Sequence, residues 1–268
     1  MLDILNYEFI QNAIIAGILV SITAGIIGSL IVVNRMVFLA GGIAHTSYGG
    51  IGLAVYFGFP IFLGASVFAV LAALLMAYIT LHNKDRIDTF IGLIWAVGMA
   101  IGIILIDLKD GYSADLMSYL FGSILAVSQN DLYYMGGLLS IIILIVSFWY
   151  KQILAVSYDS SYASLMGINV KFFYSLILVM SALTVVISIK VVGLILVIAL
   201  LTIPIYIAEK LSNSLVGMMV VSGILSSIFT LLGLFVSYNY DLTSGASIIL
   251  ISALSLGTFM IYEKLIHR

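Results

Sequence analysis

Long uncharged stretches dominate the chain and set its expected architecture. Eight long windows contain no Asp, Glu, Lys or Arg, and they cover 9–34, 36–83, 89–106, 132–150, 172–189, 191–208, 211–240 and 242–262. A bilayer core about 30 Å thick needs about 20 apolar residues in each helical span. The second window is too long for one helix, and Gly58, Phe59 and Pro60 predict a turn that divides it. The pattern therefore predicts nine membrane-spanning helices.

A shorter uncharged window, 116–130, differs from the others because it is rich in serine and amide side chains. It is too short to span a bilayer, and it predicts a short helix that lies at the outer surface or dips part of the way in. Spanning strands would alternate apolar with polar residues, and runs such as Ile141–Val146 do not. The expected fold class is therefore an all-α polytopic membrane protein.

Composition agrees with this architecture. Of 268 residues, 63% are hydrophobic, 8% are charged and none is cysteine. A soluble domain carries about 25% charged residues, so a water-soluble globule is excluded. Without cysteine the chain has neither disulfides nor thiolate metal ligands. No repeat or linker is evident, and no cleaved signal is expected at the N-terminus, so 1–268 is predicted to be a single transmembrane domain in the cell membrane.

Basic residues indicate the orientation. Lys and Arg favour the cytoplasmic side of a membrane protein. With the N-terminus outside and the C-terminus cytoplasmic, nine spans leave only Lys109 and Lys190 on the outer side. The other eight basic residues are then inside: Arg35, Lys84, Arg86, Lys151, Lys171, Lys210, Lys264 and Arg268.

One histidine stands out within the predicted spans. His45 follows the cytoplasmic Arg35 by ten residues, which is about 15 Å of helix and places it near the bilayer midplane. An ionisable group at that depth usually faces a bundle interior or a watery cavity. Paired glycines stand one turn to either side, at Gly41-Gly42 and Gly49-Gly50, and permit close helix contact or a helix break. A structural imidazole that joins two helices is the alternative to a role in a transport pathway.

A proline marks a second place in the membrane. Pro204 follows Leu200, Leu201, Thr202 and Ile203 in the predicted span 191–208. Because proline lacks an N–H and clashes with the preceding turn, a kink is expected near Thr202. The kink either sets only the shape of the helix or contributes to a gate or binding site, since broken helices near the midplane build sites in transporters.

Enzyme functions find little support in the sequence. It contains no His-Glu-x-x-His motif, and no acidic pair lies well inside a span. Ser47 and Ser181 lack an identifiable base other than His45. No G-x-x-x-x-G-K-[ST] loop is present, so the chain is not expected to hydrolyse ATP.

Five segments, in the same order along the chain, resemble the signature segments of one family of membrane proteins. Phe38–His45 with Gly50 resembles the family's FLGDALSHAVLPGVALA signature, and Asp88–Leu93 resembles its DTAIGIL segment. Tyr119–Leu125 resembles its LFGNIL outer helix, and Val192–Pro204 resembles its VG-LLV-ALLTIPAATA helix. The fifth segment resembles the family's cytoplasmic D-x-x-x-A-x-x-x-G-I coupling segment through Asp159, Ala163, Gly167 and Ile168. The chain thus resembles the membrane permease subunits of zinc, manganese and iron ABC uptake systems.

The resemblance implies a permease that forms the pathway of a divalent metal importer with a second copy of itself. A cytoplasmic ATP-binding subunit would hydrolyse ATP, and an extracytoplasmic metal-binding protein would deliver the ion. The loop 151–171 would dock on the ATPase through a short helix; an ordinary solvated loop is the alternative. No tightly bound cofactor and no nucleic-acid partner are expected. His45 would be a metal ligand or gate, with Gly41, Gly42, Thr46, Gly49, Gly50, Thr202 and Pro204 lining the pathway.

Two departures from the family pattern affect the site. Gly41 occupies the position of the family's aspartate, one turn before His45, and a lost carboxylate makes a nitrogen-preferring ion such as Zn²⁺ more compatible with the site. Tyr206 adds bulk where the family has small residues after Pro204. A proton-coupled secondary transporter in which His45 titrates, or a membrane scaffold without transport, would be the other classes.

Overall fold

The computed structural model describes residues 7–82, 86–109 and 120–266. Every regular element within these ranges is helical, which confirms the predicted all-α class. The elements are α1 (Glu8–Val33), α2 (Val37–Phe57), α3 (Ile61–His82), α4 (Ile87–Asp107), the 3-10 turn η2 (Ile124–Ala126), α6 (Gln129–Phe148), α7 (Tyr150–Tyr158), α8 (Ser160–Leu165), α9 (Val170–Val192), α10 (Val197–Leu200), α11 (Ile203–Leu211), α12 (Leu215–Tyr240) and α13 (Ser244–Ile266).

Seven of the described helices are long and apolar enough to cross a membrane. They are α1, α3, α4, α6, α9, α12 and α13. Helix α2 also has the length of a span, with 21 residues, but its glycines, His45, Thr46 and Ser47 make it less apolar. The chain is therefore a multi-pass membrane protein, whereas the count of nine spans and the orientation stay predictions. Lys84 and Arg268, which support that orientation, lie outside the described residues.

The predicted turn between α2 and α3 is present. Gly58 takes a left-handed conformation with φ of 78° and closes α2 by donating its N–H to the carbonyl of Ala54. Glycine adopts this conformation without the steric cost that a side chain brings. Helix α3 begins at Ile61, directly after Pro60, so the long window 36–83 is two helices as expected.

Two predicted elements differ from the structure. The window 191–208 is not one helix, because Gly193 has φ of 85° and the chain turns again at Leu201 and Thr202, between α10 and α11. The second break confirms the kink predicted near Thr202, because Pro204 in the first turn of α11 cannot donate to the carbonyl of Leu200.

The prediction of one short helix over 116–130 is also wrong for the part of this window that the structure describes. Residues 116–119 lie outside the described residues, and a helical turn ends at Phe121. Gly122 then takes φ of 76°, and η2 follows from Ile124 to Ala126. The left-handed glycine interrupts the helix, and the backbone of Gly122 packs directly against that of Gly193.

The chain divides into two compact units. Unit 1 comprises Met1–Ser29, Met117–Ile141 and Ser188–Arg268, and unit 2 comprises Leu30–Leu116 and Ile142–Ile187. Three of the four boundaries fall inside α1, α6 and α9, and the fourth lies outside the described residues. A single transmembrane domain over 1–268 stays a prediction.

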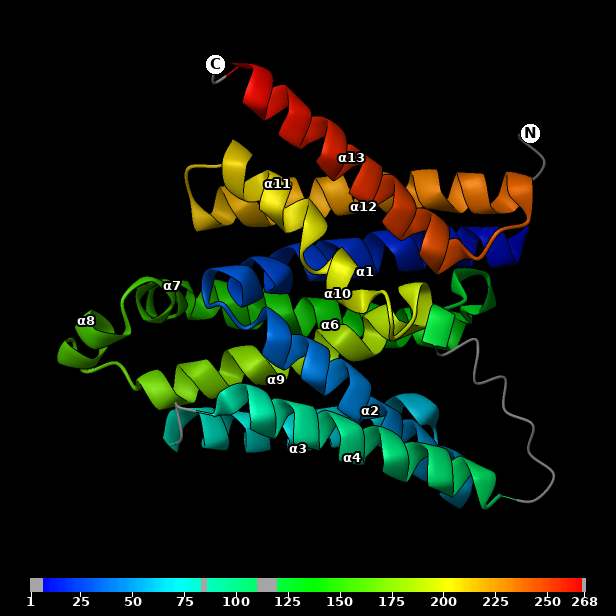
Figure 1. Cartoon of the computed structure of the whole chain (residues 1–268), viewed down its shortest axis with the longest axis horizontal. Coiled ribbons are helices and arrows are strands. Elements are labelled where there is room, and N and C mark those ends of the chain that lie inside the picture. Colours follow the sequence, from blue (N-terminus) through cyan, green and yellow to red (C-terminus); the bar gives the residue numbers. More distant parts are fainter. Residues whose placement is uncertain (1–6, 83–85, 110–119, 267–268) are drawn as a thin grey trace. The chain divides into compact units, whose positions relative to one another are not determined.

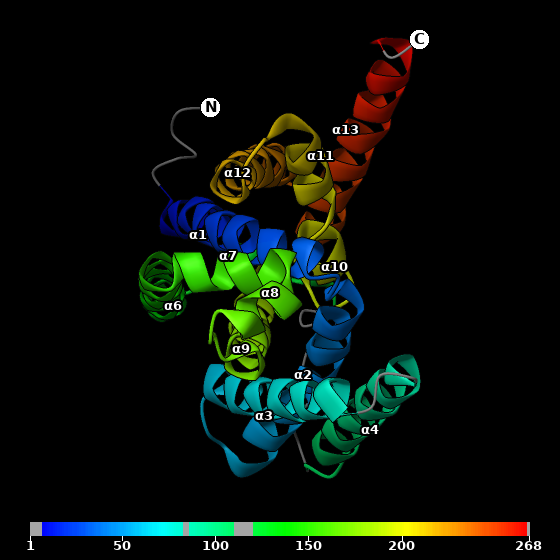
Figure 2. The ribbon, with the colours of Figure 1, turned by 90° about the vertical axis from the view of Figure 1, so that its left-hand side faces the viewer.

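In unit 2, α2 packs along both α3 and α4 (Figure 1), and the same three helices lie together in the perpendicular view of Figure 2. Glycines bring their backbones together. A methyl group on Gly49 would lie 2.8 Å from the carbonyl oxygen of Gly98, and one on Gly52 would overlap the backbone of Gly102. Small residues allow this close approach of helices in a membrane.

In unit 1, α1 and α12 are joined by hydroxyl groups. The hydroxyls of Ser21 and Thr230 are 3.0 Å apart, and Ser222 donates to the carbonyl of Gly25 over 3.1 Å. Helix α12 also packs on α11 and α13, as Figure 1 shows. At the outer end predicted for α9, Lys190 lies 3.7 Å from Asp131 of α6, so an ion pair joins these two helices.

Candidate functional site

His45 lies near the middle of α2 and stacks on an aromatic ring of α4. The ring centroids of His45 and Trp95 are 3.9 Å apart and the planes differ by 15°. Trp95 is itself held in place, because its Nε1 donates to the sulfur of Met99 over 3.2 Å. The stacked indole therefore fixes the plane of the imidazole.

The hydrogen bonding of His45 is incomplete. Its Nδ1 is buried and has no hydrogen-bond partner among the described residues. Buried polar groups in proteins are nearly always paired, so an unpaired one calls for an explanation. The structure thus does not show the interhelical hydrogen bond that a purely structural histidine would make through this atom.

The glycines around His45 serve helix contact. Helix α2 is continuous from Val37 to Phe57, so neither glycine pair breaks it. Methyl groups on Gly42 and Gly50 would overlap Ile91 of α4 and Gly64 of α3 respectively. Gly41 is buried as well. Of the two roles that the sequence allowed for these glycines, close packing is the one observed.

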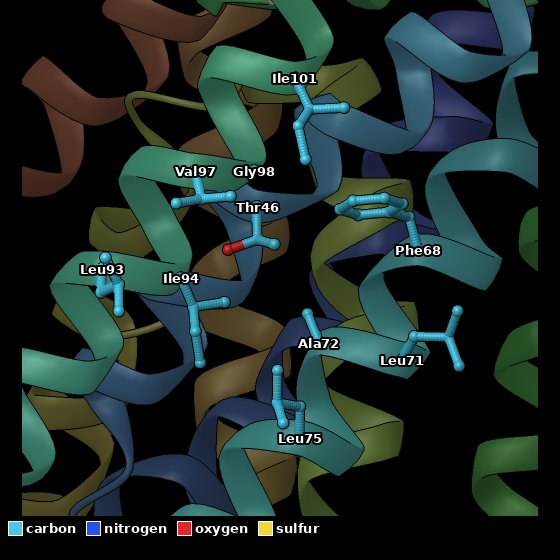
Figure 3. A pocket seen from close by; sticks show the side chains of 10 residues that line it. All are labelled: Thr46, Phe68, Leu71, Ala72, Leu75, Leu93, Ile94, Val97, Gly98 and Ile101. Atoms are coloured by element: carbon cyan, nitrogen blue, oxygen red, sulfur yellow. The ribbon is translucent and has the colours of Figure 1, made fainter.

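Thr46 follows His45 and turns toward α4. Its hydroxyl donates to the carbonyl of Gly42 over 2.7 Å, which satisfies it within α2. Its Cγ2 lies only 2.6 Å from where a methyl group on Gly98 would be. Thr46 therefore packs its methyl group against the α4 backbone and forms the floor of an apolar cavity (Figure 3).

Thr202 and Pro204 mark the break between α10 and α11 in unit 1. The Thr202 hydroxyl donates to the carbonyl of Ile198 over 2.8 Å, so it satisfies a backbone group that the break leaves without a helical partner. Pro204 is buried at the start of α11. These two residues belong to a different unit from His45, and their predicted place beside it stays a prediction.

No group of three or more His, Cys, Asp or Glu that could hold a metal ion occurs in the part of the chain that the structure describes. Within these residues, His45 thus has no partners for a closed metal site of the kind that surrounds zinc on four sides. One imidazole nitrogen can contribute to a transient, incomplete coordination sphere, which is what a transported ion requires in order to leave again.

The predicted coupling segment forms two helices with defined ends. Asp159 caps α8 by accepting from the N–H of Tyr162 over 2.9 Å. Gly167 has φ of 78°, and the N–H of Ile168 reaches the carbonyl of Ala163 over 3.0 Å, which is a Schellman-type helix end. Ala163 is fully buried, while Leu165 at the tip of α8 is 87% exposed.

Trp95 was not expected from the sequence. It lies 50 residues after His45, and no local pattern links two residues at that separation. Its position carried a signal nonetheless. The chain has two tryptophans, and tryptophan in membrane proteins concentrates at the interfaces, whereas Trp95 lies within the uncharged window 89–106.

The described helices define a multi-pass membrane protein with a histidine set among close-packed glycine helices. The ABC 3 transport family matches residues 6–263 of the chain, and the chain belongs to this family. It is thus a permease subunit of a metal ABC transporter and resides in the plasma membrane.

Three similar proteins cover nearly the whole chain. An uncharacterized membrane protein of Synechocystis, slr2045, is 49% identical over 95% of this chain and 91% of its own length. The manganese import system permease protein ScaB of Streptococcus gordonii is 34% identical over 93% of this chain and 89% of its own. The structure of PsaBC from Streptococcus pneumoniae in complex with Fab superposes with a TM-score of 0.87, at 36% identity, over 97% of this chain and 93% of that one.

Proposed function

We propose that the chain carries Mn²⁺ across the membrane as the permease of an ATP-driven importer, by alternating access, with His45 as a transient ligand or gate. Several relatives are named for manganese transport, among them ScaB of Streptococcus gordonii and MntC of Listeria monocytogenes. The single observation in the chain that carries the proposal is the buried, unpaired Nδ1 of His45. Zn²⁺ and iron are the competing cargoes.

The chemistry of His45 suits a pathway ligand. A neutral imidazole offers one lone pair to a divalent ion, and the other ligands come from water, from backbone or from a partner. Stacking on Trp95 at 3.9 Å holds the ring in one plane, so an ion would meet a preset nitrogen. Gly41 stands where the family pattern has an aspartate, so no carboxylate lies one turn before His45. Ion binding at His45 is therefore expected to be weak, and the delivery protein then determines which ion is carried.

The other pathway residues are proposed to shape the route rather than bind the ion. Gly42, Gly49 and Gly50 keep α2 close to its neighbours, so that His45 is held at a fixed depth. Thr46 has already used its hydroxyl within α2. Thr202 and Pro204 would form a wall at the helix break, where small shifts of α10 and α11 could open or close the route.

The coupling segment offers a surface for the ATP-binding subunit. Helix α8 ends in exposed Leu165 and Met166, which are 87% and 64% exposed. Apolar side chains at the tip of a polar loop fit a pocket on a partner better than they fit water. We place the ATPase contact at α7 and α8, with Asp159, Ala163, Gly167 and Ile168 fixing the shape of the segment.

The complex is completed by subunits that supply what this chain lacks. ATP binds to the separate ATPase, an extracytoplasmic protein delivers the ion, and a second copy of the permease closes the pathway. Family membership leaves the proton-coupled secondary transporter and the scaffold without an observation in their favour.

Reconstitution tests the function directly. The permease is assembled in proteoliposomes with its ATPase and delivery protein, and uptake of radioactive Mn²⁺, Zn²⁺ and Fe²⁺ is followed with ATP supplied on the ATPase side. Mn²⁺ uptake should require both ATP and the ATPase, and should exceed uptake of the other two ions. A matched assembly whose ATPase binds but cannot hydrolyse ATP is the control and should be inactive.

Two results would contradict the proposal. Ion uptake that follows an imposed proton gradient without the ATPase would restore the secondary transporter. Uptake of Zn²⁺ in preference to Mn²⁺ at equal loading of the delivery protein would leave the importer in place and overturn its proposed cargo.

A further inference from the structure

An apolar cavity of about 340 Å³ opens between α3 and α4 in unit 2. Thr46 of α2 forms its floor, and apolar side chains of α3 and α4 form its two walls (Figure 3). Leu71 and Leu75 on one wall are 59% and 49% exposed, and Leu93 and Val97 on the other are 58% and 49% exposed. The cavity is therefore a groove that opens sideways, and in a membrane its surroundings are lipid.

A second cavity of about 500 Å³ lies toward one end of the same three helices. It has a different character, because its lining includes Arg35, Arg86 and the hydroxyl residues Thr80 and Tyr174. Among the described residues of this lining, Asp88 is the one carboxylate. Neither arginine forms an ion pair with another described residue, so two guanidinium groups face one carboxylate within the described lining.

Arg35 occupies a backbone conformation that favours glycine. Its φ is 56°, and the turn is closed by the N–H of Met36 on the carbonyl of Ile31 over 2.8 Å. Left-handed backbone is costly for a residue with a side chain, and such strain persists where function calls for the side chain. A glycine would form this turn more easily, so the presence of an arginine at this position calls for a functional explanation.

The two cavities follow one another along the helices. Leu75 lines the apolar groove and Thr80 lines the polar cavity, which are five residues or about 8 Å apart on α3. On α4, Leu93 and Thr89 stand in the same relation, about 6 Å apart. A cationic cavity therefore stands directly beyond the end of an apolar groove.

We propose that this pair of cavities binds an anionic phospholipid, with the phosphate at Arg35 and Arg86 and an acyl chain in the groove between α3 and α4. Basic pockets between membrane helices bind anionic lipid headgroups, and arginine pairs with phosphate through two parallel hydrogen bonds. The basic residues favour the cytoplasmic side for this end of unit 2, which is the leaflet whose anionic lipids attract basic segments.

Other occupants match only one of the two cavities. A soluble anion such as phosphate would use the arginines and leave the groove unused. A helix from a second copy of the chain would cover the groove, but its apolar surface would offer no anionic group to Arg35 and Arg86. The site does not depend on which ion is transported, so it stands apart from the proposed cargo.

Native mass spectrometry of the full chain in mild detergent tests the site. Palmitoyl-oleoyl-phosphatidylglycerol and the zwitterionic palmitoyl-oleoyl-phosphatidylcholine are titrated onto wild type, Arg35→Gln/Arg86→Gln and Arg35→Lys/Arg86→Lys. Wild type should prefer the anionic lipid, and the glutamine pair should lose roughly 30-fold in affinity for it, because each basic side chain contributes about fivefold. The lysine pair should keep most of the preference, and Lys151→Gln, a charge removed elsewhere in unit 2, should match wild type.

A second variant separates lipid from free anion. Ala72→Phe fills the groove and should weaken phosphatidylglycerol binding while leaving the arginines in place. Displacement of the lipid by inorganic phosphate at concentrations as low as those of the lipid itself would overturn the proposal in favour of a free-anion site. Equal binding of both lipids by wild type, or a groove variant whose only effect is to dissociate a dimer, would also overturn it.

Discussion

Helices meet in two different ways in this permease. Helix α2 touches α3 and α4 through glycine backbones, as at Gly50 against Gly64 and Gly52 against Gly102. Its hydroxyls turn inward, with Thr46 and Ser47 bonded to carbonyls of their own helix. Helices α1 and α12 also meet at glycine backbones, with Gly25 against Gly223, but they are joined in addition by hydroxyl bonds such as that between Ser21 and Thr230.

The two kinds of contact differ in how they respond to substitution of a residue. A contact between two backbones leaves no room for an added methyl group, so a single glycine-to-alanine substitution is enough to disrupt it. A hydroxyl pair in a membrane contributes little, about 0.6 kcal/mol on average, and the surrounding packing survives its removal. Helices α2, α3 and α4 are thus held by steric fit, and the α1–α12 pair combines steric fit at Gly25 and Gly223 with graded polar contacts.

The largest effect is expected at Gly102 on α4. A methyl group there would overlap the carbonyl oxygen of Tyr48, which is backbone and cannot rotate away. Gly102→Ala should lower the free energy of unfolding by about 3 kcal/mol, as overpacked cores do. Chemical unfolding of the purified chain in detergent measures this change. A decrease in the free energy of unfolding of less than about 1 kcal/mol would contradict the view that steric fit holds α2 against α3 and α4.

A smaller effect is expected for the hydroxyl pair of unit 1. Ser21→Ala and Thr230→Val each remove one partner of a 3.0 Å contact without adding bulk. The coupling energy from the double-mutant cycle should be about 0.6 kcal/mol. A coupling of several kcal/mol would show that polar contacts hold this pair as firmly as glycine contacts hold α2, α3 and α4.

The smallest effect is expected at Gly92, on the same helix as Gly102. Nothing lies within 4 Å of the position of a methyl group there. Gly92→Ala should leave stability unchanged or raise it by about 0.5 kcal/mol, because alanine favours helix. The same unfolding assay measures it, and a clear destabilisation would contradict the open space beside Gly92.

Much of the fold could be predicted from charge spacing, because a bilayer allows only long apolar helices to cross it. The turn at Gly58 and Pro60 followed from the same pattern. The breaks at Gly193 and Gly122 did not, because a left-handed glycine depends on the backbone that packs against it, and Gly122 and Gly193 are far apart in sequence.

The candidate site could be predicted only in part. His45 was evident because a histidine near the bilayer midplane is costly. The partner Trp95 and the unpaired Nδ1 arise from the packing of α2 on α4, and neither is encoded in a local motif. The paired glycines allowed either a helix break or close contact, and only the positions of their neighbours distinguish the two.

The most direct test of the central claim is ATP-dependent Mn²⁺ uptake by His45→Ala in assembled proteoliposomes. His45→Gln, which keeps a polar side chain of similar length, and Trp95→Phe, which keeps an aromatic ring beside the imidazole, serve as matched variants. Removal of the imidazole should lower uptake by roughly tenfold or more, with unchanged amounts of folded permease and bound ATPase, and Trp95→Phe should retain most of the activity. If His45→Ala takes up Mn²⁺ at the wild-type rate when equal amounts of assembled transporter are compared, the role of His45 in the pathway is contradicted.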